Sequence, residues 1–284
     1  MRWLDEGDLT YYRLSGGAFP SVLTRGHLAP SPAELGQFTE ALVRGEEAVR
    51  IAETVAQPWS LYHAYRGLGI VYLRKGDRDR AIPTLERAVD AAHSGGLHQQ
   101  HANAAGCLGA AYALAGRLPQ ARAVLEEAIE QATSTRWTVY QPEFMAYLAE
   151  VRLREQRVAE AAELAARART RARSQAQRGV EAWILRLLGD IAAWREPLDT
   201  EEAAGYYYQA LALAEELGMR PLQAHCLLGL GTLYAQTDQR QQAHAALSAA
   251  IDLYRAMDMT FWLPQAEALL AQTGGAEAPE RGIS

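Results

Sequence analysis

The stretch Leu68-Gly-Ile-Val-Tyr-Leu-Arg-Lys-Gly-Asp-Arg-Asp-Arg-Ala-Ile-Pro-Thr-Leu-Glu-Arg-Ala88 decides the fold, because its pattern returns along the chain. The same order of residue types, Leu-Gly, Tyr, Ala, Leu and Ala, stands at 108–128 and again at 230–250. Turn residues recur at steps of 40, at Gly36, Gly76, Gly116 and Gln156, with later turns near Glu196-Pro197 and at Asp238. Such a period predicts a stack of helical hairpins, because one hairpin cannot bury its apolar face alone.

The spacing inside each unit predicts how the two helices of a hairpin pack. Leu68, Gly69 and Tyr72 lie at i, i+1 and i+4, which places them in one stripe on the first helix. The residues at 81, 85 and 88 form a matching stripe on the second helix. Small residues such as Gly69 let the two backbones approach closely, while Tyr72 and Leu85 fill the space beside them.

We therefore predict an all-α repeat domain at 21–272, between an irregular N-terminal segment at 1–20 and a disordered tail at 273–284. The domain holds about six hairpins and a closing helix. In the first hairpin, Pro30 and Pro32 fall inside the leading helix, where each removes a backbone donor, so we expect this unit to be degenerate. The other helices are predicted at 37–56, 58–75, 78–93, 98–115, 118–133, 138–155, 158–175, 178–195, 200–217, 221–236, 240–256 and 261–272.

Composition excludes several classes of protein. A formal charge of −6 over 284 residues argues against wholesale nucleic-acid binding. Cys107 and Cys226 do not form a Cys-x-x-Cys pair, so we expect neither a disulfide nor a zinc site built on them. The acidic amino terminus lacks the features of a signal peptide, and no apolar run approaches eighteen residues. We expect a cytoplasmic protein without a membrane span.

The repeat pattern resembles the tetratricopeptide repeat (TPR), and the resemblance covers about 21–272. It implies a right-handed superhelical solenoid of antiparallel helix hairpins. The period of 40 residues is longer than the usual one and is similar to the MalT-like repeats of large bacterial signalling proteins. The stretches Tyr206–Tyr234 and Tyr254–Leu263 resemble the carboxy-terminal arrays of proteins that also carry a class III nucleotide cyclase and a STAND- or AAA-type ATPase. Neither of those modules is found in these 284 residues.

Enzyme motifs are absent from the sequence, which contains no phosphate-binding loop, no His-Glu-x-x-His and no Gly-x-Ser-x-Gly. We therefore predict a non-catalytic protein without a cofactor. His98 and His101, with His93 nearby, could hold zinc only with a further ligand from another helix, and a solvated helix start is the favoured interpretation. The arginines between Arg152 and Arg178 are scattered around their helices, which favours a solvated face over an acidic partner or a nucleic acid.

The candidate binding surface is the stripe of each first helix that does not carry the packing residues, because this stripe faces the hollow of the superhelix. It mixes charged residues with aromatic ones, which suits recognition better than a core. The fifth hairpin is the most persuasive, since four of its residues stand at spacings of three, four and four. The predicted partner-binding residues are His63, Arg66, Arg74, Asn103, Glu143, Glu150, Arg154, Trp183, Arg186, Asp190, Trp194 and His225. No metal ligand or catalytic residue is predicted.

Two functions follow from this surface. In the first, an extended or helical segment of a protein or peptide lies along the hollow, its carboxylates meeting Arg66, Arg74, Arg154 and Arg186 while an apolar anchor packs on Trp183. In the second, the array is a sensory arm that binds a small molecule and controls an ATPase, a nucleotide cyclase or a transcription regulator. The degenerate first hairpin could also expose an apolar face near Leu28 and Val43 and cause self-association.

Overall fold

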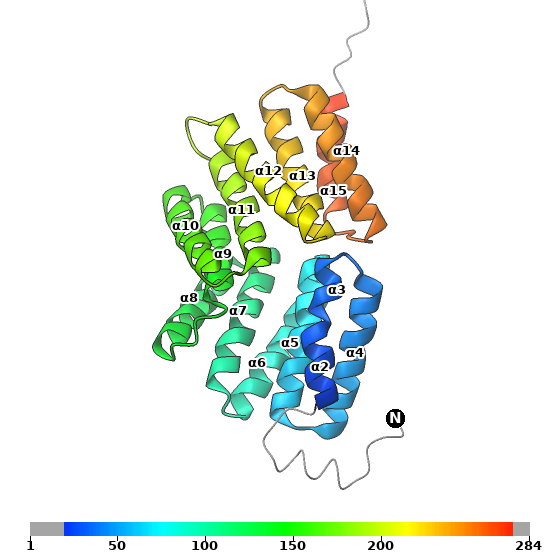
Figure 1. Ribbon diagram of the computed structural model, residues 1–284, viewed down its shortest axis with the longest axis vertical. Helices are drawn as coiled ribbons and strands as arrows, with labels where there is room; N and C mark the ends of the chain where they lie inside the picture. Colours follow the sequence, from blue (N-terminus) through cyan, green and yellow to red (C-terminus); the bar gives the residue numbers. More distant parts are fainter. Residues whose placement is uncertain (1–19, 275–284) are drawn as a thin grey trace, which may run out of the picture.

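The computed structural model describes residues 20–274, so most of the predicted N-terminal segment and of the tail lies outside the described residues. Helices account for nearly all of the described chain, and they stack in chain order around an arc (Figure 1). Their bounds are α2 (Pro20–Leu28), α3 (Pro30–Glu34), α4 (Phe38–Val55), α5 (Pro58–Lys75), α6 (Arg78–Ser94), α7 (His98–Leu114), α8 (Leu118–Ser134), α9 (Gln141–Arg154), α10 (Val158–Ser174), α11 (Arg178–Ala193), α12 (Thr200–Glu216), α13 (Arg220–Gln236), α14 (Arg240–Ala256) and α15 (Leu263–Gly274).

The predicted all-α solenoid of antiparallel hairpins is confirmed. Each odd-numbered helix from α5 to α13 pairs with the even-numbered helix that follows it, and each also packs against the next odd-numbered helix. The odd-numbered helices therefore form the inner wall of the arc and the even-numbered ones the outer layer. Among the described helices, none is long and apolar enough to cross a lipid bilayer.

The turns repeat every 20 residues rather than every 40. Residues with left-handed backbone, φ between 53° and 87°, stand at 36, 56, 76, 96, 116, 136, 156 and 176, and then at 218, 238 and 258. Each closes a helix, as where the Asp77 N–H donates to the Tyr72 carbonyl at 2.9 Å. The sequence predicted the turns at 36, 76, 116, 156 and 238 but missed the six others, four of which hold Ala, Arg or Asp rather than glycine. The interval from 176 to 218 contains two residues more than two regular steps of 20. These two residues lie in the turn between α11 and α12.

The packing between helices of a hairpin follows the predicted stripes. A Cβ atom at Gly69 would lie 2.6 Å from the Leu85 side chain, so only glycine leaves room for that leucine. Leu85 is fully buried in consequence. Gly109 with Leu125 and Gly231 with Leu247 repeat this arrangement, and at Gly189 the bulky partner is Tyr207.

Prolines divide the leading helix of the first hairpin but do not remove it. The helix runs as α2 to Leu28, breaks at Ala29, and resumes as α3 at Pro30. Pro30 is tolerated because it occupies the first position of α3, where a backbone donor has no helical partner to lose. The hairpin therefore keeps a leading helix in two parts, within 20–34, rather than the degenerate one that the sequence predicted.

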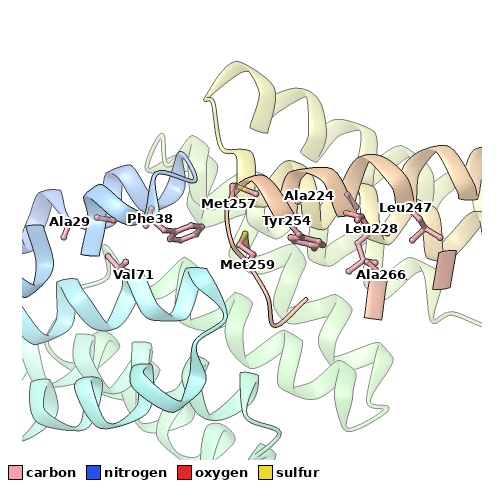
Figure 2. Packing of buried hydrophobic residues seen from close by; sticks show 14 residues of the cluster. Ala29, Phe38, Val71, Ala224, Leu228, Leu247, Tyr254, Met257, Met259 and Ala266 are labelled. Carbon is pink, nitrogen blue, oxygen red and sulfur yellow. The ribbon is translucent and has the colours of Figure 1, made fainter. Parts of the chain in front are cut away.

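The two ends of the array touch, and we call this contact the seam. Phe38 at the start of α4 belongs to the same buried cluster as Met257 and Met259, and it points toward both of them (Figure 2). Lys75, the only lysine of the sequence, lies at the end of α5 and forms an ion pair of 2.7 Å with Asp258. The arc is thereby closed by contacts between residues about 180 positions apart in sequence. Leu28 and Val43 stay exposed, so self-association through this hairpin stays a prediction.

Candidate functional site

A cavity of about 400 Å³ occupies the hollow of the arc. Its wall comes from the inner helices α5, α7, α9, α11 and α13, and from Trp262 and Gln265 next to and within α15. Tyr207 of α12 also reaches the wall, because Gly189 and Gly229 leave space for its ring. The cavity is in the range of sizes typical for small-ligand sites.

The structure places nine of the twelve predicted binding residues in this wall. They share a position on the inward stripe of an odd-numbered helix or at its end, as the repeat equivalence required. They are Arg74, Glu143, Glu150, Arg154, Trp183, Arg186, Asp190, Trp194 and His225. That they contact a ligand stays a prediction.

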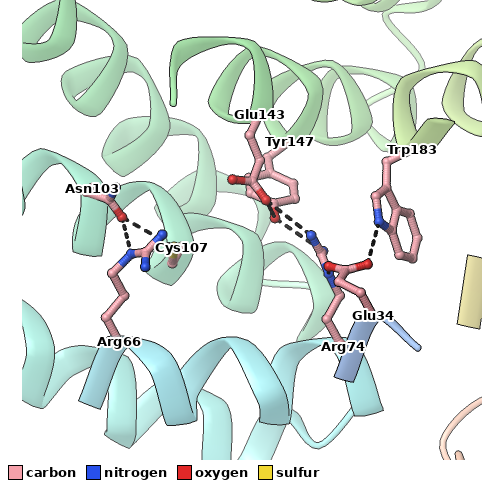
Figure 3. A network of polar contacts seen from close by, with 8 residues as sticks. All are labelled: Glu34, Arg66, Arg74, Asn103, Cys107, Glu143, Tyr147 and Trp183. Carbon is pink, nitrogen blue, oxygen red and sulfur yellow. Dashed lines mark hydrogen bonds and ion pairs between the residues drawn. The ribbon is translucent and has the colours of Figure 1, made fainter. Parts of the chain in front are cut away.

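Arg74 is a strut across the hollow. It lies on α5, and its guanidinium forms ion pairs with Glu34 of α3 and, at 3.1 Å, with Glu143 of α9 (Figure 3). The same group lies 4.7 Å from the ring centroid of Trp183 on α11, whose indole N–H donates to Glu34 at 3.1 Å. One side chain thus connects hairpins that are not neighbours in the stack. Burial alone would lower the pKa of Arg74, but Glu34 and the other nearby acceptors outweigh it and raise that pKa, so the group stays charged.

A second ionic cluster lies further along the wall. Arg186 donates to Asp190 at 2.6 Å and lies 3.7 Å from Glu150, which also pairs with Arg154 at 2.8 Å. Burial raises the pKa of Asp190, against the opposing effect of Arg186. Burial also acts to raise the pKa of Glu150, but its two arginines outweigh burial and lower it. Of the four arginines that we expected to meet carboxylates of a partner, Arg74, Arg154 and Arg186 are therefore already paired with carboxylates of the chain.

Aromatic rings form the remaining part of the wall. The His225 ring lies 4.7 Å from that of Trp262 and 5.6 Å from that of Trp183. Burial, together with Arg186 and Arg74, lowers the pKa of His225 well below its usual value, so this ring is neutral at pH 7. Trp194 is different because 57% of its surface is exposed. The indole N–H of Trp262 is buried and has no hydrogen-bond partner in the described chain.

Three predicted residues do not line the cavity. His63, Arg66 and Asn103 are buried between α5 and α7, and the ring of Tyr140 covers the Arg66 guanidinium at 5.1 Å. The inward stripe is filled at this point, since the turn before α9 lies over it. Repeat equivalence could not reveal this, because Tyr140 belongs to a turn rather than to a repeated helix position.

Sequence reasoning missed Glu34, Tyr147 and Trp262. Glu34 reaches Trp183 across 149 positions of sequence, a contact that exists only because the arc closes. Trp262 precedes the closing helix, which has no equivalent in the repeat. Tyr147 donates to Glu143 at 2.7 Å and lies four residues after it on α9, so a wider stripe would have found it.

The structure also shows how the arginine-rich stretch and the histidine group of the sequence are placed. Most arginines between Arg152 and Arg178 form ion pairs within the chain, as where Arg152 meets Glu126 at 2.6 Å and Arg178 meets Glu216. The rings of His93 and His101 lie 6.0 Å apart, and within the described residues no three metal-ligating side chains gather into a site.

Comparison with known proteins supports the repeat architecture. Residues 60–134 match the sequence profile of the tetratricopeptide repeat. Two curated relatives, the photosystem I assembly proteins Ycf3 of Prochlorococcus marinus strains MIT 9303 and MIT 9313, are each 30% identical over 101 residues. The match covers 34% of this chain and 51% of each relative, so the chain spans about half the length of the curated relatives it matches.

Solved structures resemble nearly the whole chain. NprR in complex with its cognate peptide NprX has a TM-score of 0.74 at 13% identity, covering 97% of this chain and 76% of that one. The apo form of RapI has a TM-score of 0.65 at 10% identity, covering 88% and 92%. A STAND protein with a tetratricopeptide repeat sensor from Pyrococcus horikoshii has a TM-score of 0.55 at 18% identity, covering 85% and 35%. At these identities the likeness shows the fold: the chain is a TPR-like helical solenoid.

Proposed function

We propose that this TPR-like solenoid is a non-catalytic regulatory module that binds a short peptide or a short segment of a protein in the cavity of its hollow. The observation that carries the proposal is the cavity itself, which combines a volume of about 400 Å³ with aromatic walls and charged groups. NprR, whose structure covers nearly all of this chain, was solved with a peptide, and that likeness supports the choice of ligand class.

The size of the cavity favours a shorter ligand than the sequence led us to expect, which was a long segment lying along the whole hollow. The Arg74 strut crosses the hollow, and Tyr140 covers Arg66 beyond it. The continuous inward stripe is thereby interrupted. A ligand of a few residues fits the space that is left, whereas a helix would have to displace the strut.

The choice of variants follows from the contacts. Trp183 and Arg186 are both engaged with the chain itself, so replacing them would change stability as well as binding. Trp194 is the better residue, because it lines the cavity and is largely exposed. Tyr208 is a matched control, since it is an aromatic residue with 51% of its surface exposed and lies on α12.

The test is a selection from a random peptide library, followed by fluorescence anisotropy with the recovered peptides. We expect Trp194→Ala to weaken binding about tenfold or more, as loss of an aromatic contact residue does at many interfaces, and Tyr208→Ala to leave it unchanged. Peptides that bind both variants as tightly as the unmodified protein would place binding elsewhere and refute the proposal.

A second candidate function is the sensing of a small molecule by a regulatory arm of a larger signalling protein. The volume of the cavity favours it, since it is that of a small-molecule site. The link to an ATPase or a cyclase rests on the sequence resemblance alone. A metabolite that raises the melting temperature of the unmodified protein but not of Trp194→Ala, with no peptide recovered, would favour this function.

A further inference from the structure

A cluster of polar side chains is buried beside the cavity, separate from its wall. It consists of His63 and Arg66 on α5 and Asn103 on α7, and we call it the Arg66 cluster. The exposed fractions of these side chains are 8%, 8% and 1%. Figure 3 shows Arg66 directed toward Asn103, at a different point along α5 from the Arg74 strut.

Arg66 differs from the other buried arginines because it lacks a carboxylate. Arg74 and Arg186 each have two acidic residues within ion-pair distance, whereas no described carboxylate lies within 4.0 Å of Arg66. Glu143 acts on Arg66 electrostatically, but its carboxylate is committed to Arg74 and Tyr147. Burying a cation without an anion is costly, so such a group calls for a negative partner.

The neighbours of Arg66 have spare hydrogen-bonding capacity. The Nε of Arg66 donates to Oδ1 of Asn103, which is the orientation required because a guanidinium can only donate. The amide nitrogen of Asn103 is consequently turned away, buried and without a partner. Nε2 of His63 is also buried and without a partner. The arrangement thus combines a positive charge with an unused N–H donor group.

Nothing in the cluster neutralises this charge. The pKa of His63 is lowered to about 3 by burial, with further contributions from His27 and Arg66, so its ring is neutral at pH 7. The pKa of His27 is also lowered, by burial and by the charge of Arg66. Burial raises the pKa of the Cys107 thiol to about 11, so this group carries no negative charge at pH 7. Tyr140 supplies a ring face to the guanidinium.

We propose that the Arg66 cluster is a binding site for a small oxyanion, a carboxylate or a phosphate group, held by the guanidinium of Arg66 and the side-chain amide of Asn103. The planar guanidinium matches the two oxygens of such a group. The inference stands apart from peptide binding in the cavity, because it uses residues that the cavity wall does not contain. The Tyr140 ring covers the guanidinium, so an entering anion has to displace this ring.

The test titrates the protein with sodium acetate or sodium phosphate against sodium chloride at constant ionic strength and pH 7. The readouts are the melting temperature and the side-chain amide resonances of Asn103. We expect a saturable rise in melting temperature and a shift of the Asn103 signals. Arg66→Gln should reduce both responses at least tenfold, whereas Arg154→Gln, which removes a paired arginine of the cavity wall, should keep them.

A further experiment distinguishes the two possible sources of the anion. An acetylated tripeptide with a free carboxylate that binds more tightly than its amidated form indicates the carboxyl end of a peptide, whereas a response to phosphate alone indicates a phosphate group. The stability of the Arg66→Gln variant in sodium chloride provides a second test. An unpaired buried cation can be removed without loss, so Arg66→Gln should be at least as stable as the unmodified protein there.

Three outcomes overturn the proposal. One is an Asn103 signal that stays unchanged throughout both titrations. Another is an equal response of Arg66→Gln and the unmodified protein. The third is an Arg66→Gln variant that is unfolded or strongly destabilised in chloride, because this would show that the guanidinium serves packing rather than an anion. The Trp194 experiment on the cavity can succeed or fail independently of all three.

Discussion

Replacing Arg74 by methionine tests whether the strut holds the hollow together. The change keeps an unbranched side chain of similar length but removes the charge shared by Glu34 and Glu143. Arg74 is almost fully buried, with 11% of its side chain exposed, while the two carboxylates are 26% and 21% exposed. Breaking a buried ion pair by removing one partner costs roughly 3–5 kcal/mol. Because the carboxylates keep some contact with water, we take the lower end, about 3 kcal/mol, and the contact with Trp183 adds about 0.5–1 kcal/mol.

The assay is equilibrium unfolding in urea at pH 7, followed by circular dichroism at the helical signal and by tryptophan fluorescence. Arg44→Met is the matched control, because Arg44 pairs with Glu40 at the surface with 43% of its side chain exposed, and its loss should change stability by no more than about 0.5 kcal/mol. Adding Glu34→Gln and Glu143→Gln to Arg74→Met should restore most of the loss, since no unpaired charge is then left. A loss below about 1 kcal/mol for Arg74→Met, or no recovery in the triple variant, would refute the idea of a strut.

Two further predictions concern the closed arc and its buried histidines. Met257→Asp places a carboxylate at the seam, where Met257 is 3% exposed. We therefore expect the arc to open and the radius of gyration from X-ray scattering to rise. Val43→Asp, at a position 60% exposed, should leave the radius of gyration unchanged. Because burial holds the folded pKa of His63 at about 3, the unfolded chain binds a proton below its ordinary pKa of 6.5 while the folded chain does not. Stability should therefore be unaffected by this group above pH 6.5 and fall below it, by about 2 kcal/mol at pH 5. His63→Gln should lose that part of the acid sensitivity in urea unfolding, and an unchanged pH profile would contradict the assignment.

The repeat itself could be predicted from the sequence because its causes are local. A small residue at 69 and a leucine at 85 meet wherever two helices of that length fold back on each other, and the same spacing recurs at 109 with 125 and at 231 with 247. The inward stripe follows from the same periodicity, which is why nine predicted residues lie in one wall. Even the two extra residues between α11 and α12 are visible as a shift in the pattern.

The seam and the ion pairs between different hairpins could not be predicted, since both depend on how much each hairpin turns relative to the last. A small change in that turn, added over six hairpins, decides whether Glu34 meets Trp183 or faces water. Lys75 and Asp258 lie 183 positions apart, and no local pattern connects them. Tyr140 is a similar case, because its ring reaches Arg66 from a turn that has its own geometry.

The pairing of charges in the hollow changes what kind of ligand the array can take. An inward-facing arginine suggests a ligand carboxylate only as long as no carboxylate of the chain reaches it first. Arg74, Arg154 and Arg186 are all reached by the chain's own acids, so a charged ligand in the cavity would have to exchange one ion pair for another, with little net gain. Affinity in the cavity must then come mainly from the aromatic surfaces, above all the rings of Trp194 and Trp262. The proposed recognition of an acidic group belongs instead to Arg66, which lies outside the cavity wall and has no acid beside it within the described chain.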